Sequence, residues 1–231
     1  MTELPAWDGE PTVAVMFIGN IGARRSTLIR QLGGNLHYGV GFMEGVAQQV
    51  SEQIVILDGK PLILMDVPVP YGMGEEAAIV HAERLTRALE RGYKYKLFFV
   101  LRATNRGLCR EDLAQMSAVN RCVRLANDTK VEFGIIINQI QDELVYTMYK
   151  ENFTRESLRK LFRDPRFESY ELDIEFNSVL LVRFNEEAVL PARLKEIIFE
   201  PVEDISGFAN VTANVAKVVA IGVGIARVLG L

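Results

Sequence analysis

One stretch near the amino terminus places glycine, arginine and hydroxyl side chains at the spacing used to bind phosphate. Its sequence, GNIGARRS, covers residues 19–26 between an apolar run, Val13–Ile18, and a segment with leucine and isoleucine at helical spacing. A strand, a glycine-bearing loop and a helix start together bind phosphate, because loop N–H groups and the helix N-terminus attract anions. The predicted phosphate-binding residues are Gly19, Asn20, Gly22, Arg24, Arg25, Ser26 and Thr27.

This stretch departs from the phosphate-loop consensus G-x-x-x-x-G-K-[ST] at two positions. Gly19 and Ser26 match, whereas Arg24 stands for the second glycine and Arg25 for the lysine. A glycine lets the backbone approach phosphate without a Cβ, and Arg24 adds a long side chain there. Arg25 keeps the positive charge but is larger and planar. The changes predict either a looser anion site or a closed one.

A metal-binding pair is also predicted beside this loop. Asp66 follows an apolar segment, 61–65, at the point where an aspartate would hold Mg²⁺ through water, and Ser26 would supply a hydroxyl ligand. The alternative is that Asp66 starts a turn before the prolines that follow.

Apolar segments alternate with helical patterns along most of the chain. We expect strands at 12–18, 49–57, 61–65, 95–101, 131–138 and 177–184. We expect helices from Ser26 to about Leu32 and at 76–91, 109–125, 143–162 (in two pieces) and 189–199. Residues 35–47 carry glycines without a clear period and are predicted to be a loop. This order predicts an α/β fold with three layers, in which a mostly parallel, six-stranded sheet has helices on both faces. Asp58-Gly59 is a hairpin signal, so the second and third strands are expected to be antiparallel.

Composition narrows the class of protein. The chain has 231 residues, 49% of them apolar, which suits one α/β domain with a full core. A net charge of −4 argues against nucleic-acid binding, because no basic surplus is available to neutralise phosphates. The chain has only two cysteines and two histidines, which argues against a Cys/His metal cage, and free buried thiols are expected. The basic residues of 102–110 and 155–166 alternate with acidic ones and are expected on solvated faces.

Several segments together resemble a known family. The loop GNIGARRS, the run EGVAQQV, DVPV after the third strand and VEFGIIIN at the fifth strand resemble the immunity-associated-protein (GIMAP) type of P-loop GTPase, in the septin-like and chloroplast-translocon-like branch. The resemblance covers about residues 12–199. It implies a three-layer P-loop GTPase-like fold (a G domain), GTP or GDP with Mg²⁺ as ligands, and dimerisation across the nucleotide face.

Carried over position by position, the resemblance implies further departures. Ala47 stands where the first switch has a threonine, and Val69 replaces the glycine of the DxPG motif that Asp66 begins. The base-recognition motif NKxD falls on Asn138, Gln139 and Gln141, which are therefore the predicted base-binding residues. Gln141 lacks the carboxylate that would accept hydrogen bonds from guanine, and Asp142 is one place late. Most of the discrimination of guanine from adenine is expected to be lost.

The carboxyl-terminal segment, 206–231, repeats apolar residues every three to four positions and is expected to be a helix. Its longest wholly apolar run is too short to span a bilayer. Three interpretations stay open: packing on the main domain, self-association, or peripheral contact with a membrane. The predicted organisation is a flexible lead at 1–11, a G domain at 12–200 and a helical segment at 201–231. No export signal is present, so a cytoplasmic location is expected, with membrane association as an addition.

Three functions are compatible with these residues. The leading one is a degenerate G domain, or pseudo-GTPase, that binds a protein partner or associates with itself and has weak or absent nucleotide binding. The alternative is a working GTP-binding protein in which Arg25 replaces the lysine. The third is a purely structural partner whose nucleotide site is closed. No catalytic residue is predicted, and hydrolysis is expected to be slow at best, because positioning and charge stabilisation supply nearly all of the catalysis in this class.

Overall fold

The structure is a computed structural model that describes residues 13–34, 50–68, 84–85, 87–89, 91, 93–105, 107–122, 132–170, 172–184 and 190–199. The predictions for the lead at 1–11, the loop at 35–47 and the helical segment at 201–231 lie outside these residues. Ala47 and Val69 also lie outside them. Within the described part of the chain, no helix has the length and apolar content needed to cross a membrane.

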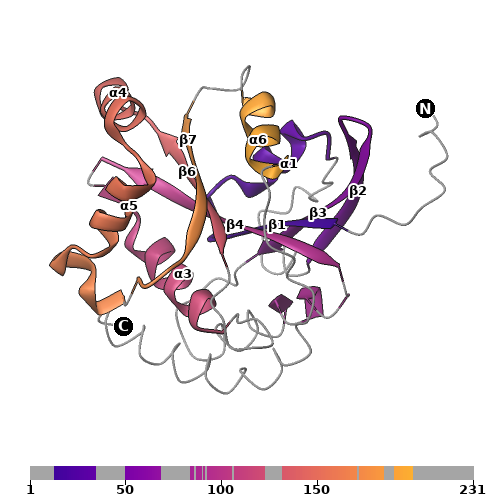
Figure 1. Cartoon of the computed structure of the whole chain (residues 1–231), viewed down its shortest axis with the longest axis horizontal. Coiled ribbons are helices and arrows are strands. Elements are labelled where there is room, and N and C mark those ends of the chain that lie inside the picture. Colours follow the sequence, from indigo (N-terminus) through magenta and orange to yellow (C-terminus); the bar gives the residue numbers. More distant parts are fainter. Residues whose placement is uncertain are drawn as a thin grey trace, which may run out of the picture.

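The described elements follow the predicted alternation of strands and helices (Figure 1). The strands are β1 (Val13–Gly19), β2 (Ser51–Leu57), β3 (Lys60–Pro68), β4 (Lys94–Thr104), β5 (Gly107–Leu108), β6 (Phe133–Ile140) and β7 (Phe176–Arg183). The helices are α1 (Arg25–Gln31), α3 (Arg110–Cys122), α4 (Glu143–Asn152), α5 (Arg155–Phe162), the 3₁₀ helix η1 (Pro165–Tyr170) and α6 (Leu190–Phe199). The described residues of the predicted helix at 76–91 include helical positions at 84–85 and 87–89.

The sheet has the order β2-β3-β1-β4-β6-β7, and the short β5 pairs with β4 outside this path. β2 and β3 are antiparallel, as predicted, and the other pairs on the path are parallel. Asp58 and Gly59 join β2 to β3 with φ angles of 49° and 75°, which is the left-handed backbone of a tight hairpin turn. The predicted mostly parallel α/β sheet is confirmed, with β5 as an additional strand.

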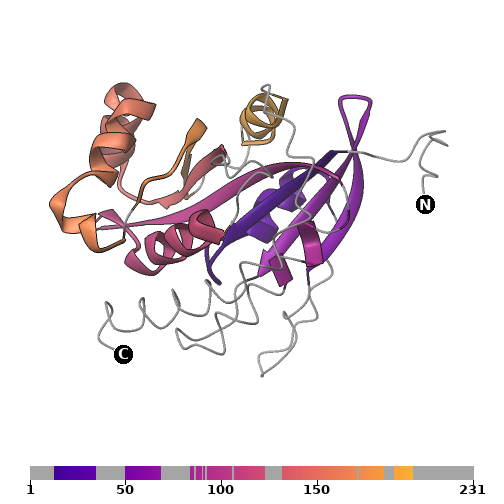
Figure 2. The ribbon, with the colours of Figure 1, turned by 60° about the horizontal axis from the view of Figure 1, so that its bottom comes forward.

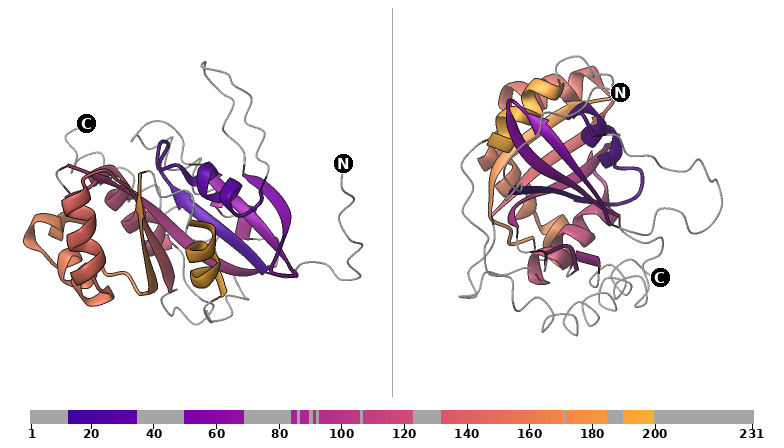
Figure 3. Two further views of the ribbon diagram at one scale, coloured as in Figure 1. Left: turned by 90° about the horizontal axis from the view of Figure 1, so that it is seen from above. Right: turned by 90° about the vertical axis from the view of Figure 1, so that its right-hand side faces the viewer.

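Helices lie on both faces of the sheet (Figure 3). The buried side chains accordingly form two separate clusters. Along β1, Ala14, Met16 and Ile18 belong to one cluster, whereas Val15 and Phe17 belong to the other. Successive side chains of a strand point to opposite faces, so a wholly apolar strand must be covered on both. α1 and α6 cover one face; α3, α4 and α5 contribute to the other cluster. α4 and α5 lie at the β7 end of the sheet, away from the β2–β3 hairpin (Figure 2).

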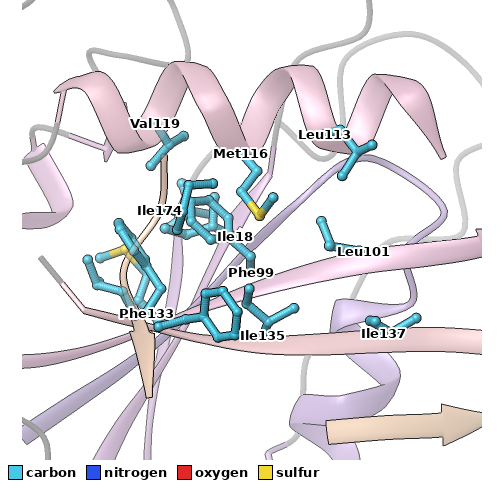
Figure 4. Close-up of a cluster of buried hydrophobic side chains, with 14 of the residues drawn as sticks. Ile18, Phe99, Leu101, Leu113, Met116, Val119, Phe133, Ile135, Ile137 and Ile174 are labelled. Carbon is cyan, nitrogen blue, oxygen red and sulfur yellow. The ribbon is translucent and has the colours of Figure 1, made fainter. Parts of the chain in front are cut away.

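The larger cluster fixes α3 against the centre of the sheet (Figure 4). Leu113, Met116 and Val119 lie three residues apart on α3, so they share one helical face and point toward the strands. Phe99 of β4 and Phe133 of β6 lie below that face, with ring centroids 4.5 Å apart. This packing sets the position of the first turn of α3, which contacts the candidate site.

Candidate phosphate-binding site

The predicted loop lies at the carboxyl edge of the parallel strands. It leaves β1 at Gly19 and enters α1 at Arg25. β1 is flanked by β3 on one side and β4 on the other. The chain builds one half of the sheet on the β3 side of β1 and the other half on the β4 side. The carboxyl edge at such a topological switch point is where open α/β sheets bind ligands.

The backbone of the loop bends through two residues with positive φ. Gly22 has a φ of 88°, and Arg24 has φ 60° and ψ 32°, a left-handed conformation that a glycine would adopt without strain. Ala23 N–H donates to the Asn20 carbonyl at 3.1 Å. At Gly19, a Cβ would lie 2.6 Å from the Val100 carbonyl oxygen, so only glycine fits there. Arg24 therefore takes the backbone conformation expected of the glycine that it replaces.

The side chain of Arg25 folds back beneath the loop and is only 7% exposed. Its Nε donates to Asp66 Oδ1 at 2.6 Å. One terminal guanidinium nitrogen donates to the Asn20 carbonyl at 2.6 Å and also to the Gly19 carbonyl. The guanidinium therefore joins the start of the loop to the end of β3.

Ser26 and Asp66, the predicted metal ligands, lie together but contact each other. Asp66 is 1% exposed, and the Ser26 hydroxyl donates to its Oδ2 at 3.3 Å. Each carboxylate oxygen thus has a donor from this chain. Among the described residues, no cluster of three or more His, Cys, Asp and Glu side chains could hold a metal ion. The two predicted ligands therefore lie side by side, and a Mg²⁺ ion bound there would have to replace the hydrogen bonds that Asp66 accepts from Arg25 and Ser26.

The Arg24 side chain contacts a residue outside the loop, and Thr27 contacts the loop through its backbone. The Arg24 guanidinium carbon lies 4.2 Å from the ring centroid of Phe184, directly after β7, in a cation–π arrangement. Thr27 lies in the first turn of α1; its N–H donates to the Arg24 carbonyl at 3.1 Å. Both arginines of the loop therefore have partners within the chain.

A buried carboxylate that sequence reasoning missed holds the loop from α3. Asp112 is 1% exposed; its Oδ1 accepts from Asn20 Nδ2 at 2.7 Å and from an Arg102 terminal nitrogen at 2.8 Å. Its Oδ2 accepts from the Arg102 backbone N–H at 2.6 Å. The hydrogen bonds that Arg102 donates to Asp112 raise the pKa of Arg102 above its ordinary value. Arg102, expected on a solvated face, is 27% exposed and pairs with this buried acid of α3.

Cys109 belongs to the same network and is a buried free thiol, as predicted. Arg102 donates to its Sγ at 2.8 Å, and the thiol donates to Glu111 Oε2 at 2.7 Å. Burial, followed by this hydrogen bond to Glu111, raises the pKa of Cys109 to about 12. The same bond lowers the pKa of Glu111. The thiol stays protonated and unreactive near neutral pH.

Two of the three predicted base-binding residues contact the phosphate loop. Asn138 is 5% exposed, and its Nδ2 donates to the Ala23 carbonyl at 3.0 Å. Its Oδ1 accepts from the Gln139 N–H at 2.8 Å, and Gln139 has a φ of 65°. The Gln139 side-chain amide donates to the Gly22 carbonyl. Asn138 and Gln139 thereby fix the far side of the loop.

The third predicted base-binding residue, Gln141, is exposed and lines an open cleft of about 650 Å³. The cleft lies between the ends of β4 and β6 and the start of α4; Arg102, Gln139 and Val145 also line it. Asp142 caps α4, since its carboxylate accepts from the N–H groups of Leu144 (2.8 Å) and Val145 (3.1 Å). It is therefore engaged as a helix cap and not aligned as a substitute for the missing base-binding carboxylate.

An exposed apolar surface follows this cleft on α4. Leu144 and Met148, one turn apart, are 69% and 61% exposed, and Val145 is 37% exposed. On the phosphate loop, Ile21 is 44% exposed. We call Leu144, Val145 and Met148 the α4 apolar face.

Comparisons with known proteins identify the fold. No protein-family description matches the sequence, and no curated protein matches it. Among solved structures, the chloroplast translocon components atToc33 and psToc159, in a study of dimerisation and GTPase activity, match with a TM-score of 0.51 and 16% identity, over 84% of this chain and 86% of theirs. An S. thermophilus NFeoB mutant bound to GDP matches with a TM-score of 0.46 and 17% identity, over 85% of this chain.

A third structure, the cytosolic domain of the T. maritima FeoB iron transporter in a GDP form, has a TM-score of 0.43 and 16% identity, over 83% of this chain. This chain spans 65% and 66% of the two FeoB chains. The translocon match and the strand order identify the fold as that of a P-loop GTPase domain, as predicted.

Proposed function

We propose that this chain is a degenerate P-loop GTPase-like domain that works as a binding or assembly module, with weak or absent nucleotide binding. The observation that carries the proposal is the engagement of the Asp66 carboxylate by Arg25 and Ser26. Catalysis in this class depends on a positioned cation and positioned phosphates. Here the carboxylate that would position the cation is bound to the chain's own side chains.

The base end of the site supports the same proposal. Gln141 offers no carboxylate to guanine, and Asp142 is bound to the first turn of α4. Asn138 and Gln139 donate to carbonyls of the phosphate loop. A protein with these contacts has the means to stabilise its own loop but lacks the charged acceptor that selects guanine.

The alternative is a GTP-binding GTPase that uses Arg25 in place of lysine. The positive φ angles of Gly22 and Arg24 favour it, because the loop backbone keeps a bend suited to phosphate. On this alternative, GTP or GDP would displace Arg25 from Asp66 and Mg²⁺ would then bind Ser26 and Asp66.

GTP turnover separates the two functions. Phosphate release from GTP and Mg²⁺ would be measured with wild-type protein and with Ser26→Ala, which loses the hydroxyl but keeps the Arg25–Asp66 pair. We expect no turnover above the Ser26→Ala background. Turnover that disappears in Ser26→Ala, with folding unchanged by circular dichroism, would establish the alternative.

For the assembly role, we propose self-association through the α4 apolar face. The face is exposed and adjoins the cleft through Val145. In the chloroplast translocon components atToc33 and psToc159, dimerisation is important for the GTPase activity. A cytoplasmic location and peripheral membrane contact through residues 206–231 stay predictions.

Light scattering as a function of concentration tests this role. We expect a dimer whose association weakens in Leu144→Ser and Met148→Ser but not in Glu151→Ser, an exposed residue on the same helix. A monomer at concentrations up to about 1 mM, where association worth about 4 kcal/mol is visible, would show that the face does not bind a second copy.

A further inference from the structure

The Asp66 carboxylate needs a positive counter-ion, because a buried charge without one is costly. Asp66 is 1% exposed at the end of β3, opposite Phe17 of β1 in the register of the sheet. In P-loop proteins that use magnesium, the metal ion helps to neutralise the corresponding aspartate. In this chain, another group close to Asp66 must supply the positive charge if no metal ion is bound.

Arg25 supplies it from the loop itself. The Nε–Oδ1 distance is 2.6 Å, and the guanidinium is nearly as buried as the carboxylate, at 7% exposure. Such charge-assisted hydrogen bonds are stronger than neutral ones. The Gly19 and Asn20 carbonyls accept from the same side chain, so the guanidinium has acceptors on two sides.

A divalent cation at this carboxylate would have to displace these contacts. Arginine cannot lose its proton in a protein, so its charge persists at every relevant pH. A second cation beside it would be repelled, and the repulsion is strong where water is excluded. The Asp66 Oδ2 also has a donor, Ser26 Oγ, at 3.3 Å.

We propose that the Arg25 guanidinium replaces the divalent cation as the counter-ion of Asp66, so that this carboxylate does not bind a divalent metal ion. The inference rests on the proposed function, which identifies the site, and adds which residue takes the place of the metal ion. It makes Arg25 the residue that excludes the metal. Replacing Arg25 should therefore open the carboxylate to a cation.

The test uses Mn²⁺ alone, without nucleotide. Paramagnetic broadening of backbone amide signals would be followed by NMR in the full chain, for wild type, Arg25→Ala, Arg25→Lys and Asp66→Asn. We expect selective broadening around Ser26 and Val67 in Arg25→Ala at Mn²⁺ concentrations about tenfold lower than any effect there in wild type, a change worth about 1.4 kcal/mol. Asp58, 55% exposed, provides an internal reference for non-specific binding to a surface carboxylate.

Two results would overturn the proposal. One is selective broadening of Ser26 and Val67 in wild type that disappears in Asp66→Asn, because the carboxylate would then bind metal despite Arg25. The other is no gain in Arg25→Ala. If Arg25→Ala does not fold, Arg25→Gln, which removes the charge but keeps a polar side chain, takes its place, and Arg25→Lys, which retains a cation, is the control expected to show no gain. Since no nucleotide is present, these results are independent of GTP turnover, which tests the proposed function separately.

Discussion

The phosphate end and the base end of the site depart from the P-loop GTPase pattern in different ways. At the phosphate end the positive charge of the consensus lysine is kept, but Arg25 is buried against Asp66. At the base end the charged residue is missing from position 141, and the neighbouring Asp142 caps a helix beside an open cleft. At the phosphate end, the guanidinium of Arg25 is larger than a lysine ammonium and lies in an enclosed loop, so it contacts acceptors inside the protein. At the base end, the carboxylate is missing from an exposed loop, so the cleft beside Gln141 stays open.

The comparison predicts that changes at the phosphate end cost far more stability than changes at the base end. The largest effect is expected for Asp66→Asn, which leaves the Arg25 charge buried without its partner. Breaking one side of a buried pair typically costs about 3–5 kcal/mol. Urea denaturation would measure it. The control is Asp58→Asn, which removes an exposed contact to Lys195 and should cost about 0–1 kcal/mol; equal losses would show that the Arg25–Asp66 pair is not buried in solution.

The reactivity of Cys109 tests whether water reaches the hydrogen-bond network that Arg102, Asp112 and Cys109 form beneath the phosphate end. A pKa near 12 in place of the ordinary 9.0 lowers the thiolate fraction at pH 8 by about a thousandfold, so alkylation by iodoacetamide should slow by a similar factor. Mass spectrometry of the Cys109 peptide would give the rate, with urea-unfolded protein as the reference. The raised pKa of the folded thiol also stabilises the fold below about pH 9, and this contribution is lost as the pH rises toward 12. Equal rates of Cys109 alkylation in folded and urea-unfolded protein would mean that water and reagent reach the thiol in the folded protein.

Asp112→Asn tests the connection between the loop and α3. The amide would keep the shape but lose the charge that accepts from Asn20 and Arg102. We expect a loss of about 2–3 kcal/mol, since charged hydrogen bonds are worth more than neutral ones. Hydrogen exchange should also become faster at the loop amides. Unchanged stability and exchange would show that Asp112 does not hold the loop; Glu151→Gln, which changes an exposed carboxylate on α4, is the control.

The smallest effect is expected at the base end. Asp142→Ala removes the cap of α4 and should cost about 1 kcal/mol without changing nucleotide affinity. Asp142→Ser, which restores a capping oxygen, should recover most of the loss. Thermal unfolding with and without GTP would measure both. A fall in GTP affinity in Asp142→Ala would show that this carboxylate reads the base after all.

Much of the fold was predictable because its strands are apolar on nearly every position. Such strands must be buried on both faces, and β1 divides its side chains between two clusters accordingly. The Asp58-Gly59 turn fixed the one antiparallel pair on the main path through its backbone preference. β5 was missed, since two residues carry no period.

The residues of the loop were identified from their spacing, but their partners were not. Asp112 pairs with Arg102 across a turn and with Asn20 from a distant part of the chain, so no local pattern reveals it. The contact of Arg24 with Phe184 likewise depends on the sheet order. The capping role of Asp142 had a signal, because an aspartate directly before a helical segment is a typical N-cap.

Calorimetric titration with GTP in Mg²⁺ and in EDTA tests the central claim most directly, namely that the chain's own side chains fill the site. Ser26→Ala and Arg25→Ala would be titrated alongside wild type, with GDP and ATP as reference ligands. The account predicts no micromolar binding of any nucleotide by wild type, and equal heats in Mg²⁺ and EDTA. Micromolar GTP binding that requires Mg²⁺ and is lost in both variants would contradict it, because the altered loop would then still hold a metal-bound nucleotide.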